Sequence, residues 1–556
     1  MDTRSARAVP RASRLLALLW LAFVVRGAWY CALLPPWEGY DEPFHFAALQ
    51  HVASGQGLPH ADTPISLEVQ KSLHLLPLPW ELHFHDIPHP LTPHDDFWKL
   101  PPGEREQRIN AVRALAPQEG GQPATEPILN YESQQAPLYY WTFAIPLRRI
   151  ASLPLLSRIY LLRFLSLVVA SISIPIAYWI ARHVLQSERQ ALGVTAVIVL
   201  LPELMIDLAR VGNETPALVC YTAMLAAAAL AVHQPLSWRP WLLLGAALGG
   251  GLLSKAYLLS ALPAVIVIAI LAMWHPSGAG QQRPNRASVL VRLVAALAVA
   301  GAIAGRWYAG VHRATGSWTG VKDDIALSHL SLLQKLGQVP HVNWKSGVLS
   351  ILISHVWFGA WSFLRVPNIV CVAAFVVIAV ATAGVVVRLR RGRATSVEKR
   401  DILVLAAFYV CFWAGLLYDV VVNFLSQGVS ASAGWYLHAT VAAEVVLLVW
   451  GLQAFVSARF VFLALAFGAC LLDLYGTHAL MMPYYTGLTA HVGKSVPGAL
   501  WATLTQLPLV FDRLRQLRPG WLDAPVLMSW WIGYWVATLG TVVMILTIFR
   551  KHRTGT

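Results

Sequence analysis

The sequence predicts an all-α polytopic membrane protein: a bundle of about 12 transmembrane helices with a large external first loop that carries interfacial helices. Three observations predict this fold. Of the 556 residues, 57% are hydrophobic and only 13% are charged, against about 25% charged residues in an ordinary soluble domain. The mean hydropathy is +0.55. Apolar runs of about 20 residues, the length that crosses a bilayer, recur along the chain.

Twelve apolar runs are candidate membrane spans. The first is long and lacks a small-x-small cleavage site, which predicts a retained anchor rather than a signal peptide. The runs are 14–34, 158–182, 189–208, 215–233, 239–255, 257–274, 289–308, 367–388, 402–422, 436–454, 458–475 and 526–549.

Basic residues predict the orientation. The net charge is +14, and clusters of Lys and Arg fall on one side if there are twelve spans and both termini are cytoplasmic, as the positive-inside rule requires. Such placement favours a membrane protein over a nucleic-acid partner. The composition suggests a bacterial plasma membrane, with the endoplasmic reticulum as the alternative. The clusters are Arg4–Arg14, Arg182/Arg189, Arg283/Arg286/Arg292, Arg388–Arg400 and Arg550–Arg553.

This topology divides the chain into seven parts, with three long loops outside the cytoplasm. Two amphipathic segments of the first loop, 43–54 and 136–150, are predicted to be helices near the membrane surface. The parts are the N-terminus and first span (1–34), the first external loop (35–157), spans two to seven (158–308), the second external loop (309–366), spans eight to eleven (367–475), the third external loop (476–525), and the last span with a basic tail (526–556).

The most prominent local motif, WEGYDEPFHF, directly follows the first span. It places Glu38, Asp41, Glu42 and His45 near one face of a helix at the boundary between lipid and water. Neighbouring acids there raise each other's pKa, as a general base requires. The structural alternative is that Asp41 caps a helix and Glu42 complements its N-terminal dipole.

An Asp-Glu pair directly after the first span resembles the GT-C superfamily of polyprenyl-phosphate-sugar-dependent glycosyltransferases, which includes protein O-mannosyltransferases and the aminoarabinose transferase of lipid A. The segment ESQQAPLYY, 132–140, is similar to the family's QPPLYY, and RVGNE, 210–214, to its R-x-x-N-D. Lys255 matches a lysine at the outer end of a span. AGWYL, 433–437, resembles Q-G-R-Y-L, with Trp435 replacing the arginine.

The resemblance implies a sugar donor on a polyprenyl phosphate and a glycan, lipid or protein acceptor. Asp41 would be the base that takes the acceptor proton, and Glu42 would orient the acceptor or the base. The leaving phosphate needs cations at the outer surface, for which Arg210, Lys255 and Arg306 are the candidates. Their alternative role is snorkelling to lipid headgroups. Arg158 and Arg163 are weaker candidates.

Further residues are expected to bind substrate. Amides and carboxylates before an aromatic run suit sugar hydroxyls and sugar faces, although aromatic side chains also anchor helices at the interface. The substrate-binding candidates beside the cations are Glu38, His45, Glu132, Gln134, Gln135, Tyr139, Asn213, Glu214 and Tyr436.

Metals and cofactors have little support in the sequence. His83-x-His85 has a possible ligand spacing, but Pro88, Pro90 and Pro93 remove any regular geometry, so no metal is assigned. Asp323-Asp324 is expected to be a capping or solvated pair. The acids predicted within spans should face the bundle interior or a cavity. They are Asp419, Glu444 and Asp473.

Two other classes use many spans. A transporter or lipid flippase would place its charges at the bilayer midplane, whereas these acids lie at the surface. A polysaccharide polymerase or ligase would have its main external loop late in the chain. Phosphate-binding Gly-rich motifs are absent and the cytoplasmic loops are short, which argues against a nucleotide-sugar donor.

Overall fold

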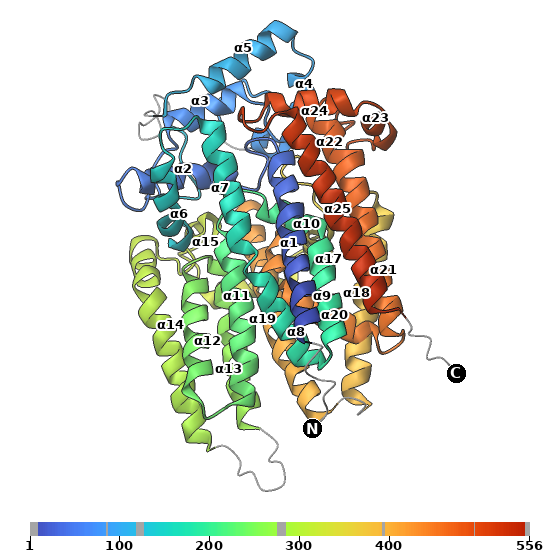
Figure 1. The fold of residues 1–556 in the computed structure, drawn as a ribbon. Helices are drawn as coiled ribbons and strands as arrows, with labels where there is room; N and C mark the ends of the chain where they lie inside the picture. The colour runs from blue at the N-terminus through green and yellow to red at the C-terminus, as the bar shows by residue number, and fades with distance from the viewer. Residues whose placement is uncertain are drawn as a thin grey trace, which may run out of the picture.

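The computed structural model describes residues 9–84, 87–117, 127–274, 285–391, 395–493 and 495–550. Within these ranges the chain is helical, with three isolated bridges and no strand of a sheet. Figure 1 shows long helices side by side in one bundle and short helices gathered at one end of it. We call this end the loop end. The predicted fold class is confirmed.

Fourteen helices form the body of the bundle. They are α1 (Val9–Leu33), α7 (Leu155–Ala170), α8 (Ser173–Leu185), α9 (Glu188–Leu200), α10 (Pro202–Leu208), α11 (Glu214–His233), α12 (Trp238–Leu252), α13 (Ala261–Met273), α14 (Arg286–Thr315), α18 (Asn368–Arg390), α19 (Ser396–Gln427), α20 (Val441–Leu452), α21 (Ala458–Asp473) and α25 (Ala524–Ile548).

All twelve predicted spans are helical, but fewer are long enough to cross a membrane by themselves. Among the described residues ten helices pass by length and composition, or eleven if α9 and α10 count as one span bent by 62°. That bend precedes Pro202, whose ring disfavours a helical residue before it. The predicted span 239–255 is α12, whose 15 residues extend only about 22 Å.

The short helices at the loop end come from the three predicted external loops (Figure 1). The predicted helices 43–54 and 136–150 are confirmed as α2 and α6. The first loop supplies α2 (Glu42–Ala53), α3 (Leu67–Leu75), α4 (His94–Phe97), α5 (Pro102–Arg113) and α6 (Leu138–Arg149). The second supplies α15 (Lys322–Ala326), α16 (Leu332–Gly337) and α17 (Trp344–Val356), and the third α22 (Met482–Tyr485), α23 (Leu500–Thr505) and α24 (Leu507–Gln516).

The two predicted surface helices differ in their surroundings. Helix α2 is buried on nearly every side, including its charged residues Glu42 and His45. Helix α6 buries Tyr139 and Tyr140 but leaves Trp141 and Ile145 about half exposed. Only α6 therefore has the amphipathic surface of an interfacial helix.

Small residues allow the body helices to approach closely. A Cβ atom added to Gly384 of α18 would lie 2.0 Å from the backbone oxygen of Gly451 in α20. One added to Gly245 of α12 would lie 2.3 Å from the backbone oxygen of Ala296 in α14. Such contacts between backbones are typical of helix packing in membranes.

The described basic clusters lie at the end of the bundle opposite the loops. Helix α14 begins at Arg286 and α18 ends at Arg390, both at the end where α1 begins (Figure 1). This arrangement agrees with the predicted orientation. Arg4, Arg7, Arg283, Arg393, Lys551 and Arg553 lie outside the described residues, as do His85 and Asp86 of the histidine-rich segment.

Candidate active site

Asp41 stands where α1 has ended and α2 begins. Its backbone is left-handed, with φ 57° and ψ 11°, and it occupies the N-cap position of α2 without a side-chain hydrogen bond to the helix. Left-handed backbone is uncommon for residues other than glycine and often marks functional sites. The carboxylate Oδ1 instead accepts a hydrogen bond from the Tyr131 hydroxyl at 2.5 Å. The Asp41 side chain therefore does not cap α2, contrary to the alternative interpretation of the motif.

The Asp41 side chain lines a cavity of about 680 Å³ at the loop end of the bundle. The first loop contributes the wall at Asp41, Glu81, Tyr131, Glu132 and Gln135. The segment after α12, the second loop and α19 form the other walls. Its principal polar lining residues are Asp41, Glu81, Tyr131, Glu132, Gln135, Lys255, Asp323, Asp324, Asp419, Asn423, Trp435 and Tyr436.

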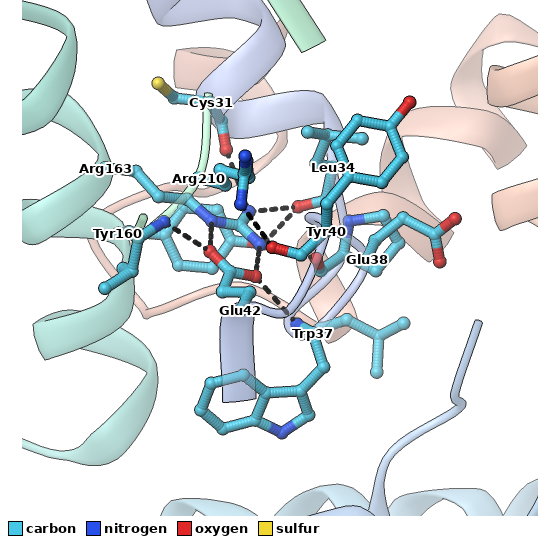
Figure 2. Close-up of polar contacts among 12 residues, drawn as sticks. Cys31, Leu34, Trp37, Glu38, Tyr40, Glu42, Tyr160, Arg163 and Arg210 are labelled. Carbon is cyan, nitrogen blue, oxygen red and sulfur yellow. Dashed lines mark hydrogen bonds and ion pairs between the residues drawn. The ribbon is translucent and has the colours of Figure 1, made fainter. Parts of the chain in front are cut away.

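Glu42 is in a different environment, although it is the next residue. It is fully buried, and its two carboxylate oxygens accept hydrogen bonds from Nε and Nη2 of Arg163. The backbone N–H groups of Trp37 and Val211 donate to it at 3.0 Å each. Figure 2 shows Glu42 between Arg163 and Trp37. Glu42 does not line the cavity, so the structure gives it no access to an acceptor.

Glu42 and Arg163 form a buried ion pair, which we call the clamp. Beyond Glu42, Arg163 donates to the backbone oxygens of Leu34 at 2.6 Å and Pro35 at 2.8 Å, where the chain leaves α1 (Figure 2). Arg158 forms a similar buried pair with Glu68. Both arginines are thus structural partners of carboxylates in the first loop, and neither lines the cavity.

A row of alternating charges leads from beneath the cavity into it. Arg210 is 1% exposed and contacts Asp207 and Glu214, at 3.0 and 2.5 Å. Glu214 also pairs with Lys255. Arg210 further donates to the backbone oxygen of Tyr40. Arg210 and Glu214 lie below the surface of the cavity, and only Lys255 lines it.

Aromatic rings surround the Lys255 ammonium. Its Nζ lies 4.7 Å from the centre of the Tyr436 ring and 5.7 Å from that of Tyr257. Trp435, which stands where the related motif has arginine, stacks on Tyr40 with ring centres 4.1 Å apart. The tryptophan therefore provides an aromatic wall instead of a second cation.

Glu132 brings a second titratable carboxylate to the same wall as Asp41. Glu132 is 8% exposed, and its Oε2 atom lacks a hydrogen-bond partner. Burial, and next the negative charge of Asp41, raise the pKa of Glu132 from its ordinary 4.5 to about 8. Burial also raises the pKa of Glu81 to about 7. The cavity therefore contains carboxyl groups that titrate near neutrality.

Other predicted binding residues lie behind this wall. His45 is buried and bonds through Nδ1 to the Tyr140 hydroxyl at 2.7 Å, and burial lowers its pKa well below the usual value. Asn213 donates to Gln135 at 3.2 Å, and of these two only Gln135 lines the cavity. Tyr139 is buried in α6, with its hydroxyl 3.4 Å from Ser166 Oγ.

Three predicted residues lie away from the cavity lining. Glu38 is buried, contacts His94 at 3.2 Å and accepts from the backbone N–H of Ser362 at 2.9 Å, so it joins the first loop to the second. Gln134 is half-buried and does not line the cavity. Arg306 is exposed on α14, as a snorkelling arginine would be.

Several lining residues were missed by the sequence reasoning, among them Glu81 and Tyr131. Neither lies in a periodic pattern or a recognised motif. Asp419 was expected to face the interior or a cavity, and it lines the cavity. Glu444 and Asp473, predicted in the same way, pair with His355 and Arg26 inside the bundle.

One group among the described residues has the composition of a metal site. The ligand atoms of His183, His233 and Asp401 lie within 4.8 Å of one another. Asp401 lies 18 residues before Asp419 on α19, about 27 Å along the helix. Arg400 donates to His233 Nδ1 at 2.9 Å, which leaves the proton on the Nε2 atom that faces Asp401. That tautomer opposes metal binding.

Residues 135–307 match the family model described as dolichyl-phosphate-mannose-protein mannosyltransferase. The matched segment includes Arg210–Glu214 and Lys255. No curated protein matches the chain.

Two solved structures are similar in shape. ArnT from Cupriavidus metallidurans, solved with undecaprenyl phosphate, is 12% identical with a TM-score of 0.43, over 97% of this chain and 78% of that one. The oligosaccharyltransferase AglB from Archaeoglobus fulgidus, solved with an inhibitory peptide and a dolichol-phosphate, is 14% identical with a TM-score of 0.35. That match covers 86% of this chain and 56% of AglB. The family-model match confirms the predicted resemblance: this chain is similar to the GT-C glycosyltransferases, whose sugar donors are linked to polyprenyl phosphate.

Proposed function

We propose that the protein transfers a sugar from a polyprenyl-phosphate donor to a hydroxyl or amine acceptor on the extracytoplasmic face of the membrane, with Asp41 as the general base. One observation carries the proposal. Among the described residues of the motif WEGYDEPFHF, only Asp41 lines the cavity, and Lys255 lines the same cavity. A base and a cation in one cavity are what this displacement needs.

The reaction would be a single displacement. The acceptor oxygen or nitrogen attacks the anomeric carbon, and its proton passes to the Asp41 carboxylate. The bond between the anomeric carbon and the phosphate oxygen breaks, and its electron pair leaves with the lipid phosphate. Lys255 stabilises the charge on that phosphate.

The hydrophobic lining of the cavity supports a lipid-linked donor. Leu259, Phe412, Leu416 and Val422 line it beside the charged groups. An amphiphile with a polyprenyl chain and a charged head matches this division between apolar and polar walls. A soluble nucleotide-sugar would gain nothing from the apolar wall.

The remaining predicted residues receive supporting roles in this proposal. Glu132 and Gln135 line the cavity and would contact substrate directly. Arg210, Asn213 and Glu214 would hold Lys255 and Gln135 in place. Glu42 would position the first loop through its pair with Arg163. Glu38 would position it through its contact with the second loop.

Native mass spectrometry of the purified chain tests the proposal. Wild type and Asp41→Asn are incubated with a panel of polyprenyl-phosphate sugars. We expect both proteins to retain a lipid-linked sugar and only wild type to lose the sugar slowly to solvent or acceptor. Retention of bare lipid phosphate without sugar selectivity or turnover would favour a flippase or a polymerase subunit.

The location of the loop end is tested separately. Glu106 is exposed on α5, so a cysteine at this position is accessible, whereas Ser72 is fully buried and unsuitable. We expect an impermeant maleimide to label Glu106→Cys in intact cells. Labelling only after permeabilisation would place the cavity on the cytoplasmic side and contradict the proposed orientation.

A further inference from the structure

Helix α19 presents a polar stripe to the cavity that the proposed reaction does not use. Asp419, Asn423 and Gln427 are spaced four residues apart and all line the cavity. Residues at this spacing lie on one face of a helix. Phe412 and Leu416 line the cavity one to two turns earlier on the helix. The lining of α19 thus changes from apolar to polar toward the loop end.

The hydrogen bonds of Asp419 leave one oxygen unused. Ser432 Oγ donates to Oδ2 at 2.8 Å, and Asn423 Nδ2 donates to the same oxygen at 3.2 Å. Among the described residues none donates to Oδ1. Asn423 Nδ2 also donates to the backbone oxygen of Ala431 at 2.9 Å, so the rotamers of the stripe are fixed. Asp419 therefore offers a preorganised acceptor to the cavity.

The two neighbouring acids, Asp323 and Asp324, already have hydrogen-bond partners. Asp324 pairs with Lys335 at 2.6 Å and accepts from Ser317 at 2.6 Å. Asp323 accepts from Gln427 Nε2 at 2.8 Å. The charge of Asp324 is thus balanced by Lys335, whereas in the described part of the chain Asp323 and Asp419 are bonded only by neutral donors, as a hydroxyl group of a ligand would be.

Other parts of the cavity lining also have unused polar atoms. Glu132 Oε2 and Trp435 Nε1 are buried without hydrogen-bond partners, and both residues line the cavity. Buried polar atoms without a protein partner are free to bond water or a ligand, and these two lie at the cavity. The cavity thus offers two free acceptors, on Asp419 and Glu132, and one free donor, on the indole of Trp435. This set of groups beside an aromatic ring matches a molecule with several hydroxyl groups.

We propose that Asp419, oriented by Asn423 and Ser432, binds a hydroxyl group of a sugar through Oδ1 and determines which sugar the site accepts. The inference rests on the proposed function and names a specificity residue for it. The hydroxyl belongs either to the transferred sugar of the donor or to a glycan acceptor. A site built to bond a hydroxyl discriminates strongly against ligands that lack it.

Binding selectivity tests the proposal. The affinities of undecaprenyl phosphate carrying mannose or glucose, of bare undecaprenyl phosphate and of the methyl glycosides are measured for wild type, Asp419→Asn and Asn423→Ala. Asp512→Asn is the matched control, because that carboxylate is exposed on α24. We expect Asp419→Asn to lose sugar-dependent affinity about 10- to 100-fold, Asn423→Ala to lose less, and affinity for the bare lipid phosphate to stay within about twofold.

The arms of the experiment separate the two sources of the hydroxyl. A loss confined to the sugar-bearing lipid assigns it to the donor, and a loss confined to a methyl glycoside assigns it to the acceptor. An unchanged sugar preference in Asp419→Asn, or an equal loss for bare lipid, would overturn the proposal. If wild type itself has no sugar preference, the proposed function fails instead.

Discussion

Asp41 and Glu42 are adjacent acids in two opposite environments. Asp41 is in a left-handed backbone conformation and faces the cavity, where its side chain accepts a hydrogen bond from Tyr131. Glu42 is fully buried and bonded to Arg163 and to backbone N–H groups. A carboxylate with unused hydrogen-bonding capacity is available for chemistry, whereas one whose oxygens are fully hydrogen-bonded contributes to the fold. This difference supports Asp41 as the proposed base and gives Glu42 a structural role.

The largest expected effect follows from removing the base. Asp41→Asn keeps the size of the side chain and its hydrogen bond from Tyr131 but cannot take a proton. We expect the transfer rate to fall on the order of 10²- to 10⁴-fold, with the melting temperature of the detergent-solubilised protein little changed. A rate within threefold of wild type would remove Asp41 from the role of base.

The next effect concerns the clamp. Glu42→Gln leaves the buried Arg163 charge without a counter-charge, and breaking a buried pair in this way costs about 3–5 kcal/mol. We expect a lower melting temperature and a lower yield of folded protein. Thermal unfolding in detergent measures both. Unchanged stability would contradict the clamp.

A third prediction separates two outer cations. Lys255→Met removes a charged group from the cavity, and we expect affinity for bare undecaprenyl phosphate to fall about 10- to 100-fold, as for loss of a hydrogen bond to a charged group. Arg306→Met is the matched control and should leave it unchanged, because Arg306 is exposed outside the cavity. Equal effects of both changes would indicate that Lys255, like Arg306, only contacts lipid headgroups.

The last prediction is a pH dependence of stability. The raised pKa of Glu132, about 8 in the folded protein against an ordinary 4.5, means that the folded state binds more protons between these values. Its contribution to stability is fully present below about pH 4.5 and is lost as the pH rises through 8. We expect Glu132→Gln to flatten this loss. Parallel melting curves against pH for both proteins would contradict it.

The fold was predictable because apolar runs specify membrane helices locally. Their lengths were less certain: α12 is too short to count as a span alone, since glycines and a turn precede Lys255. Asp41, Glu132 and Lys255 line one cavity because distant segments pack together. In the sequence, only the order of the family-like motifs indicated that these residues would meet.

The division of roles within the motif was not predictable. Helical spacing put Glu38, Asp41, Glu42 and His45 on one face, but α2 begins only at Glu42, and the left-handed backbone of Asp41 directs its side chain to the cavity instead. Arg163 lies in the second predicted span and pairs with Glu42 across 121 residues. Sequence spacing contains no record of such a partner. Of the polar stripe on α19 only Asp419 was singled out from the sequence; Asn423, Gln427 and Ser432 were recognised only in the structure.

Single-turnover transfer from a radiolabelled lipid-linked sugar, measured per folded molecule for Asp41→Asn and Glu42→Gln together, tests the central claim most directly. The account predicts that Asp41→Asn binds the donor without transferring the sugar, and that the folded fraction of Glu42→Gln transfers it at a rate near wild type. The opposite result, with transfer kept by Asp41→Asn and lost in well-folded Glu42→Gln, would contradict it.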